Sequence, residues 1–349
     1  EDRQPDDHPN IRYWGDHQVV YLLRLMELSR RFHPGRLEEL LNRDMFVYAD
    51  LPYRIRRYNL LIRDPHNTID YISDHEEIIR QRTTTIGVDG KLYVNRQGEL
   101  VRINLTEKLL VNLLTRLSNF VAGGGIWMNT QRPEWNDANN ALAGFGLSMV
   151  TVYYLRRFLI FIRQLWQDCK PESFSISEEV ADMLRGFSGM LAKCNPVLAM
   201  SIDDDIRKDI LDAFGTMGDK YREQVYAGLS GNRISISGEE LAAFYDRYLQ
   251  YIDYTIRENR RADGLYHAYN LIHFSDHGYT VEYLYEMLEG QVAVLSSGYL
   301  GAAESADLLD ALRASKMYRD DQKSYMLYPE KELPFFLDKN RIPAESVSD

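Results

Sequence analysis

Cysteine is almost missing from this chain, and its scarcity argues against disulfide-stabilised and cysteine-zinc proteins. Of 349 residues only two are cysteines, Cys169 and Cys194. Two cysteines supply neither a disulfide framework nor a zinc signature, so we predict a reducing, cytoplasmic compartment. We also predict no secretory signal from the opening residues. The sequence starts without methionine, and we expect its first residue to be a cut or processed end.

Long apolar runs and excess positive charge are lacking too. The most apolar run, residues 141–155, contains Gly144, Gly146, Ser148 and Thr151 and is shorter than the roughly 20 residues of a membrane span. With 41 basic against 52 acidic residues, the net charge is −11. This balance argues against a nucleic acid or an anionic membrane as partner, because both favour basic faces. A neutral polyol would be indifferent to the charge.

Helical spacing of apolar residues dominates the rest of the sequence. The predicted helices cover residues 16–31, 36–45, 70–82, 147–167, 280–295 and 302–314, with others starting at 106, 175 and 237. Ser175 with Glu178, and Ser237 with Glu240, are spaced as capping boxes. Residues 123–125 are three glycines, interpreted as a helix stop and hinge. Only residues 88–104 alternate like a β-hairpin.

These patterns predict an all-α fold. The helices at 16–31 and 147–167 are apolar on nearly every face, which is typical of inner helices enclosed by outer ones. We therefore expect residues 1–349 to form a single (α/α)6 six-hairpin toroid with the small β-hairpin inserted near 88–104. The acidic run 203–205 fits the first turn of a helix, where carboxylates complement the dipole, better than a metal site. No metal is predicted.

One polar loop, residues 129–140, is the strongest functional candidate. It contains five amide side chains, an arginine, two carboxylates and a tryptophan; the amides are Asn129, Gln131, Asn136, Asn139 and Asn140. Amides and carboxylates can grip vicinal hydroxyls, and an indole offers a flat face to a sugar ring. The alternative is a polar connection between helices, anchored in the core by Trp135.

Three stretches together resemble the catalytic domain of cellobiose and chitobiose phosphorylases and the phosphorylase-like end of cyclic β-glucan synthases. They are residues 134–140 (Glu-Trp-Asn-Asp-Ala-Asn-Asn), residues 288–298 with 308–312 and 324–329, and residues 13–17 (Tyr-Trp-Gly-Asp-His). The family's loop reads Gly-Asp-Trp-Asn-Asp-Gly, whereas this chain has Glu134 before the tryptophan and Ala138 in place of the last glycine. The segments that bind phosphate in the family would follow residue 349, so the resemblance implies a divergent member or a fragment of a larger protein.

The resemblance implies that Asp137 is the general acid of an inverting cleavage. A role for Asp137 as a helix cap is the alternative, and it would favour the charged carboxylate instead. Trp135 would stack on a sugar. The remaining candidate substrate-binding residues are Arg132, Glu134, Asn136, Asn140, Trp14, Asp16, Tyr266, His267, Glu289 and Gln291. Structural roles compete at each: a loop anchor for Arg132, a cap with a core tryptophan at 14–16, and an ordinary turn at 266–267.

Two functions of different classes remain open. The first is a carbohydrate-active enzyme that hydrolyses or phosphorolyses a β-linked disaccharide or glucan, with no cofactor beyond inorganic phosphate as co-substrate. The second is a non-catalytic domain that binds glycans or acts as a scaffold within a larger protein. In either case the expected partners are a disaccharide or oligosaccharide, and other domains of a longer chain or further copies of this one.

Overall fold

The computed structural model describes residues 16–129, 142–169, 172–194, 201–330 and 334–343. In this part of the chain helices and strands are mixed, so the all-α toroid prediction is wrong. The helices are α1 (Asp16–Phe32), α2 (Arg36–Leu40), α3 (Tyr58–Arg63), α4 (Ser73–Ile86), the 3-10 helix η1 (Gly87–Lys91), α5 (Leu105–Leu117), α7 (Met149–Cys169), α8 (Glu178–Cys194), α9 (Asp204–Tyr226), α10 (Gly238–Glu258), α11 (Leu288–Ser296), α12 (Ala302–Ala314) and α13 (Phe336–Lys339).

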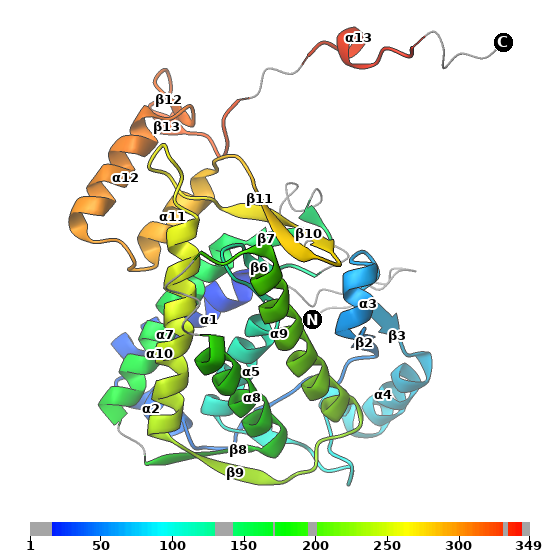
Figure 1. The fold of residues 1–349 in the computed structure, drawn as a ribbon. Helices are drawn as coiled ribbons and strands as arrows, with labels where there is room; N and C mark the ends of the chain where they lie inside the picture. Colours follow the sequence, from blue (N-terminus) through cyan, green and yellow to red (C-terminus); the bar gives the residue numbers. More distant parts are fainter. Residues whose placement is uncertain (1–15, 130–141, 170–171, 195–200, 331–333, 344–349) are drawn as a thin grey trace, which may run out of the picture.

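The largest sheet is antiparallel, with the strand order β11-β10-β7-β6-β5. Its strands are β5 (Phe120–Val121), β6 (Gly125–Trp127), β7 (Gly146–Ser148), β10 (Tyr269–Ser275) and β11 (Gly278–Tyr283). Four two-stranded ladders pair β1 (Phe46–Val47) with β4 (Arg102–Ile103), β2 (Tyr53–Ile55) with β3 (Ile69–Tyr71), β8 (Ser173–Ser177) with β9 (Arg233–Ser237), and β12 (Tyr318–Arg319) with β13 (Ser324–Tyr325). The five-stranded sheet lies at one end of the long helices and the β8–β9 ladder at the other (Figure 1).

Short buried strands explain why the sheet was missed. β5, β6 and β7 have two or three residues each and are fully buried, so they show no alternation. Gly123 and Gly124 lie in the turn between β5 and β6, and Gly125 is the first residue of β6. Gly123 and Gly125 have positive φ, and none of the three glycines ends a helix. The helix predicted from Leu147 starts at Met149, after strand β7. The helix predicted over 280–295 is β11 followed by α11.

Several helix ends follow their sequence signals. The Ser237 side chain accepts a hydrogen bond from the Glu240 amide and caps α10. Asp203 caps α9, and Asp204 and Asp205 occupy its first turn, as predicted. Ser175, in contrast, lies inside strand β8 and does not cap α8. The predicted helix 36–45 ends at Leu40.

The segment 88–104 is less regular than a hairpin. Asn95 and Gly98 form its turn, where Val94 and Leu100 make an isolated antiparallel bridge. Its start is the 3-10 helix η1, and Arg102–Ile103 pair with β1 from another part of the chain.

Buried apolar side chains from α1 through Met317 form one contiguous core. Packing between α7 and both α10 and α11 lies at its centre, and α1 covers a further side of α7. A second apolar cluster, built around Trp127, Tyr58 and Tyr279, joins the sheet to α3 and α9. No helix in the described segments is long and apolar enough to cross a membrane.

Candidate functional site

The predicted sugar-binding loop joins two neighbouring strands rather than two helices. Asp137, Trp135, Arg132, Glu134, Asn136 and Asn140 lie outside the described residues, as does Trp14. Asp16 is the first residue of α1, and the part of the chain that the structure describes does not include its side chain. What is described are the two stems: β6 and β7 pair directly, with Trp127 opposite Leu147. The indole Nε1 of Trp127 donates to the Gly144 carbonyl 2.9 Å away, which ties the stems together.

The four remaining candidates, Tyr266, His267, Glu289 and Gln291, are brought together by the packing of the 260–269 turn on α11. Gln291 is fully buried. Its Oε1 accepts from the Tyr266 amide at 2.8 Å, and its Nε2 donates to the Tyr266 carbonyl at 2.7 Å. One side chain therefore satisfies both backbone groups of Tyr266, which makes Gln291 a structural clamp. Glu289 is partly exposed and accepts a hydrogen bond from the Tyr269 hydroxyl at 3.1 Å.

Tyr266 is also a packing residue. Its ring is 4% exposed and meets the ring of Tyr153 edge to face, with centroids 6.4 Å apart. The Tyr153 hydroxyl, in α7, donates to the His267 carbonyl at 2.9 Å, and this bond anchors the turn to α7. Of the two turn residues, only His267 presents a functional group to a partly open environment.

The His267 imidazole is held in one orientation and one tautomer. Its Nδ1 lies 2.8 Å from the Leu284 carbonyl oxygen. Because a carbonyl only accepts, Nδ1 carries the proton and Nε2 carries the lone pair of the neutral ring. Burial lowers the pKa of His267 below its ordinary 6.5, and the Leu284 bond opposes this shift only in part. The ring is therefore neutral at pH 7.

A charged network and an exposed phenol surround this imidazole. The Tyr283 ring lies on His267 with centroids 5.0 Å apart and planes tilted by 33°, and 44% of Tyr283 remains exposed. Arg261 pairs with Asp263 at 2.7 Å and with Glu286 at 3.0 Å. We call Arg261, Asp263, His267, Tyr283 and Glu286 the Tyr283 cluster.

Three segments that are distant in sequence build the Tyr283 cluster. The 260–269 turn supplies the arginine, aspartate and imidazole, with Gly264 at a φ of 82° where a side chain would be strained. The end of β11 supplies Tyr283 and the residues leading to Glu286. The glycine turn between β5 and β6 supports it, because the Tyr283 hydroxyl donates to the Gly123 carbonyl at 3.3 Å.

More aromatic surface continues beside this cluster. Tyr285 and Tyr328 are both exposed and meet edge to face with centroids 6.5 Å apart. The Leu288 amide donates to the Leu327 carbonyl at 2.8 Å, which holds the 324–330 segment against the start of α11. Exposed aromatic faces next to carboxylates and a guanidinium offer stacking together with directional hydrogen bonds, the combination that a sugar requires.

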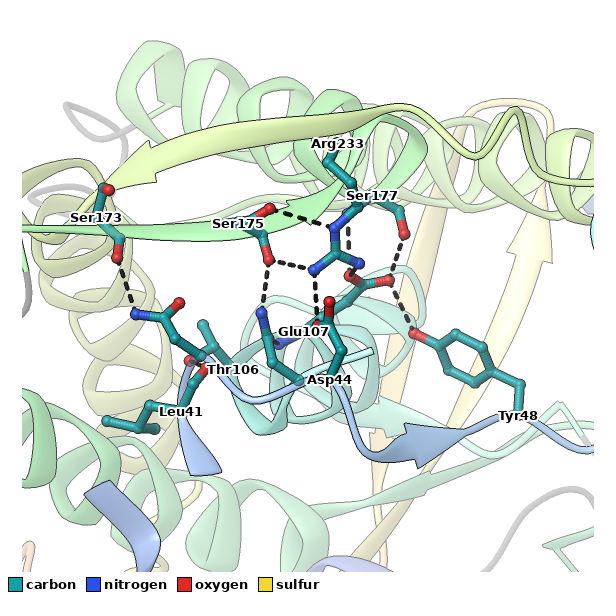
Figure 2. Close-up of polar contacts among 11 residues, drawn as sticks. Leu41, Asp44, Tyr48, Thr106, Glu107, Ser173, Ser175, Ser177 and Arg233 are labelled. Atoms are coloured by element: carbon teal, nitrogen blue, oxygen red, sulfur yellow. Dashed lines mark hydrogen bonds and ion pairs between the residues drawn. The ribbon is translucent and has the colours of Figure 1, made fainter. Parts of the chain in front are cut away.

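A second polar cluster, which sequence reasoning missed, lies at the opposite end of the helices. The Glu107 carboxylate, in the first turn of α5, has no exposed surface. It accepts from the Ser177 amide at 2.9 Å, the Ser177 hydroxyl at 2.6 Å and the Arg233 guanidinium at 3.0 Å. Figure 2 shows these groups converging from α5, β8 and β9, with Tyr48 approaching from the segment after β1.

Burial raises the pKa of Glu107, and the bonds from Ser177 and Arg233 only partly reverse that shift. A sequence signal existed in Asn104 followed by Glu107, because Asn104 caps α5. In a capping box the Glu107 side chain would accept a hydrogen bond from the Asn104 backbone amide. Here its carboxylate instead bonds to Ser177 in β8 and Arg233 in β9. Since its oxygens are occupied by protein donors, this cluster joins elements of the fold and offers little to a ligand.

Among the described residues, no group of three or more His, Cys, Asp or Glu side chains is arranged to hold a metal ion. Comparisons with protein-family models and with curated proteins found no match to this chain.

Proposed function

We propose that the protein binds a carbohydrate chain at the Tyr283 cluster and that the polar loop between β6 and β7 cleaves or phosphorolyses a glycosidic bond. The observation that carries the binding step is the half-exposed Tyr283 ring, fixed on a neutral imidazole beside the Arg261–Glu286 ion pair. A sugar stacked on this phenol would find a guanidinium and carboxylates within reach of its hydroxyls.

The cleavage step is supported by the chemistry of the loop and by its attachment. Residues 130–141 hold a candidate acid, Asp137, and a candidate stacking residue, Trp135. The loop is followed by strand β7, which pairs with β10. The first residue of β10, Tyr269, donates a hydrogen bond to Glu289. Loops on rigid scaffolds commonly carry binding and catalytic groups. In this proposal Asp137 protonates the leaving oxygen while water or phosphate attacks from the opposite face.

Binding is tested by calorimetric titration of β-linked gluco-oligosaccharides. We expect Tyr283→Ala to weaken binding about tenfold, equivalent to about 1.4 kcal/mol. Tyr283→Phe, which keeps the ring, should retain most of the affinity. Tyr71→Ala removes an exposed tyrosine on β3 and serves as the control. Equal affinities for all three variants would reject the Tyr283 cluster as the binding site.

Cleavage is tested by sugar release from a panel of β-linked disaccharides and glucans, with and without phosphate. Asp137→Asn should abolish release, and Asp307→Asn, an exposed aspartate on α12, should not. A requirement for phosphate would identify a phosphorylase, and its absence a hydrolase. Binding without release by the parent protein would leave a glycan-binding domain and overturn the catalytic part of the proposal.

A further inference from the structure

The Tyr283 cluster contains one guanidinium that is shared by two carboxylates. Arg261 donates from Nε to both Asp263 oxygens at 3.1 Å, and from Nη2 to Asp263 at 2.7 Å and to Glu286 at 3.0 Å. One positive charge against two negative charges leaves the cluster with an excess negative charge, because the His267 ring is neutral at pH 7. A site with this balance beside an exposed aromatic ring favours a cationic group on its ligand.

The two aromatic members of the cluster have already used their own protons. The His267 Nδ1 proton is donated to the Leu284 carbonyl, so Nε2 offers a lone pair, and none of the described residues donates to it. The Tyr283 hydroxyl donates to the Gly123 carbonyl at 3.3 Å, while 44% of the residue stays exposed. The imidazole and the phenol therefore offer a ligand a lone pair and a π face, and both attract a donor-rich group.

The charges next to the cluster do not reverse its sign. Arg207 and Glu258 both act on the Tyr283 hydroxyl, and they shift its pKa in opposite directions. Each of the two is also paired, Arg207 with Asp204 and Glu258 with Arg257. These neighbours cancel one another, so the excess negative charge of Asp263 and Glu286 over Arg261 remains.

We propose that the Tyr283 cluster selects a sugar that carries a free amino group, with the ammonium held by the Tyr283 ring, His267 Nε2 and the Glu286 carboxylate. This inference rests on the binding step of the proposed function and names its substrate class, a β-linked oligomer of glucosamine. An ammonium brings three N–H donors and a positive charge to groups that accept. The net charge of −11 would also attract a polycationic oligosaccharide from a distance.

Calorimetric titration of the purified chain with three β-1,4-linked tetrasaccharides tests this selectivity. They are tetraglucosamine, its fully N-acetylated form and cellotetraose, which differ at the 2-position of each sugar. At about pH 6.5 the sugar amines are largely charged and the His267 ring is mostly neutral. We expect the parent to bind tetraglucosamine about tenfold more tightly than either uncharged tetrasaccharide. Added salt should reduce this preference, because it screens the charges.

A matched pair of variants tests where the ammonium is held. Glu286→Gln removes a charge from the cluster and keeps the shape of the side chain, so the ratio of tetraglucosamine to cellotetraose affinity should fall towards one. Glu240→Gln makes the same change in net charge at the start of α10, beside the β8–β9 ladder and away from the cluster (Figure 1). Its ratio should equal that of the parent. Far-UV circular dichroism checks that both variants are folded.

The outcomes separate this inference from the binding step on which it rests. Equal affinities of the parent for all three tetrasaccharides, or a ratio that ignores Glu286→Gln, would overturn the selection of an amine and leave the binding step in place. No binding of any tetrasaccharide would reject the binding step as well. Spermidine, an amine without a sugar ring, should bind more weakly than tetraglucosamine, and equal affinity would overturn the assignment of an amino sugar.

Discussion

Arg233 reaches from strand β9 to the Glu107 carboxylate, 3.0 Å away, although Glu107 has no solvent-exposed surface. This contact ties the first turn of α5 to strand β9, since Arg233 follows Glu107 by 126 residues in the chain. Arg233 also donates to the Ser175 carbonyl in β8 and pairs with Asp44 at 3.2 Å. One guanidinium therefore connects three segments.

Replacing Arg233 with methionine should destabilise the fold, because the buried carboxylate loses its only cationic partner among the described residues. We expect a loss of about 2 kcal/mol in the free energy of unfolding, below the range for fully buried pairs since Arg233 is partly exposed. Urea unfolding measures it. The control is Arg185→Met, which breaks the surface pair with Glu240 and should cost under about 1 kcal/mol. Equal losses would contradict the special role of Arg233.

The raised pKa of Glu107 predicts a specific pH dependence. In the folded state the carboxyl binds its proton more tightly than in the unfolded state, whose pKa is near 4.5. The stability that this proton binding contributes is therefore fully present below the pKa of the unfolded state. It is lost as the pH rises through the pKa of the folded state. Glu107→Gln lacks this titration. The stability difference between variant and parent should shift in favour of the variant between pH 4 and pH 7, and a flat difference would contradict the shift.

Gln291→Leu should strongly destabilise the turn at Tyr266. The leucine fits the space but leaves the Tyr266 amide and carbonyl, both bonded to Gln291, without partners. Unsatisfied buried groups cost about 1–3 kcal/mol each, so we expect a loss of about 3 kcal/mol. Val292→Ala, at the exposed neighbouring position, should change stability by less than about 0.5 kcal/mol. Thermal and urea unfolding of both variants provide the comparison.

The His267 ring should titrate below its ordinary pKa of 6.5, because burial disfavours the imidazolium. The unfolded state then binds more protons in the window just below that pKa, so stability attributable to His267 rises with pH there. Proton–carbon NMR of the ring gives the midpoint directly. Tyr283→Ala, which uncovers the imidazole, should move the midpoint upward. A midpoint at or above 6.5 in the parent would refute the assigned environment.

Two helical glycines offer a matched pair. A Cβ on Gly215 of α9 would lie 2.1 Å from Cδ2 of Tyr58, whereas one on Gly189 of α8 would meet nothing within 4 Å. Gly215→Ala should therefore cost about 1–3 kcal/mol through overpacking and displace Tyr58 from Asp212. Gly189→Ala should instead stabilise by up to about 1 kcal/mol through helix propensity. Similar effects in both would contradict the close packing of α3 on α9.

Sequence alone located those helices whose signals are local. The α12 bounds, 302–314, match the expectation, and the Ser237 cap was readable because a cap and its amide are three residues apart. The β10–β11 hairpin was missed even though its residues include many aromatic and β-branched types. Residues 280–295 also have apolar residues at helical spacing, and this pattern led to a helix prediction in place of a strand. The pairing of β10 with β7, which the local sequence does not reveal, favours the strand.

The site divides in the same way. Tyr266, His267, Glu289 and Gln291 were selected individually, and their convergence depends on how α11 packs under the turn. Arg261, Tyr283 and Glu286 were not selected, because nothing in their own segments indicates that β11 returns to His267. The exposure of α1 was predicted wrongly. Its sequence is apolar on many faces, yet Leu25, Leu28 and Phe32 are exposed by half or more, because only tertiary packing determines which side of a helix is covered.

The β8–β9 ladder also has a kinetic consequence. Its pairing of Ser173–Ser177 with Arg233–Ser237 closes a loop that contains α8 and α9. Closing so long a loop costs entropy that five residue pairs cannot recover early in folding. The contact of α8 with α9 is shorter in range and available sooner. We therefore expect the two helices to dock first and the ladder, with the Glu107–Arg233 contact that fastens it, to form late.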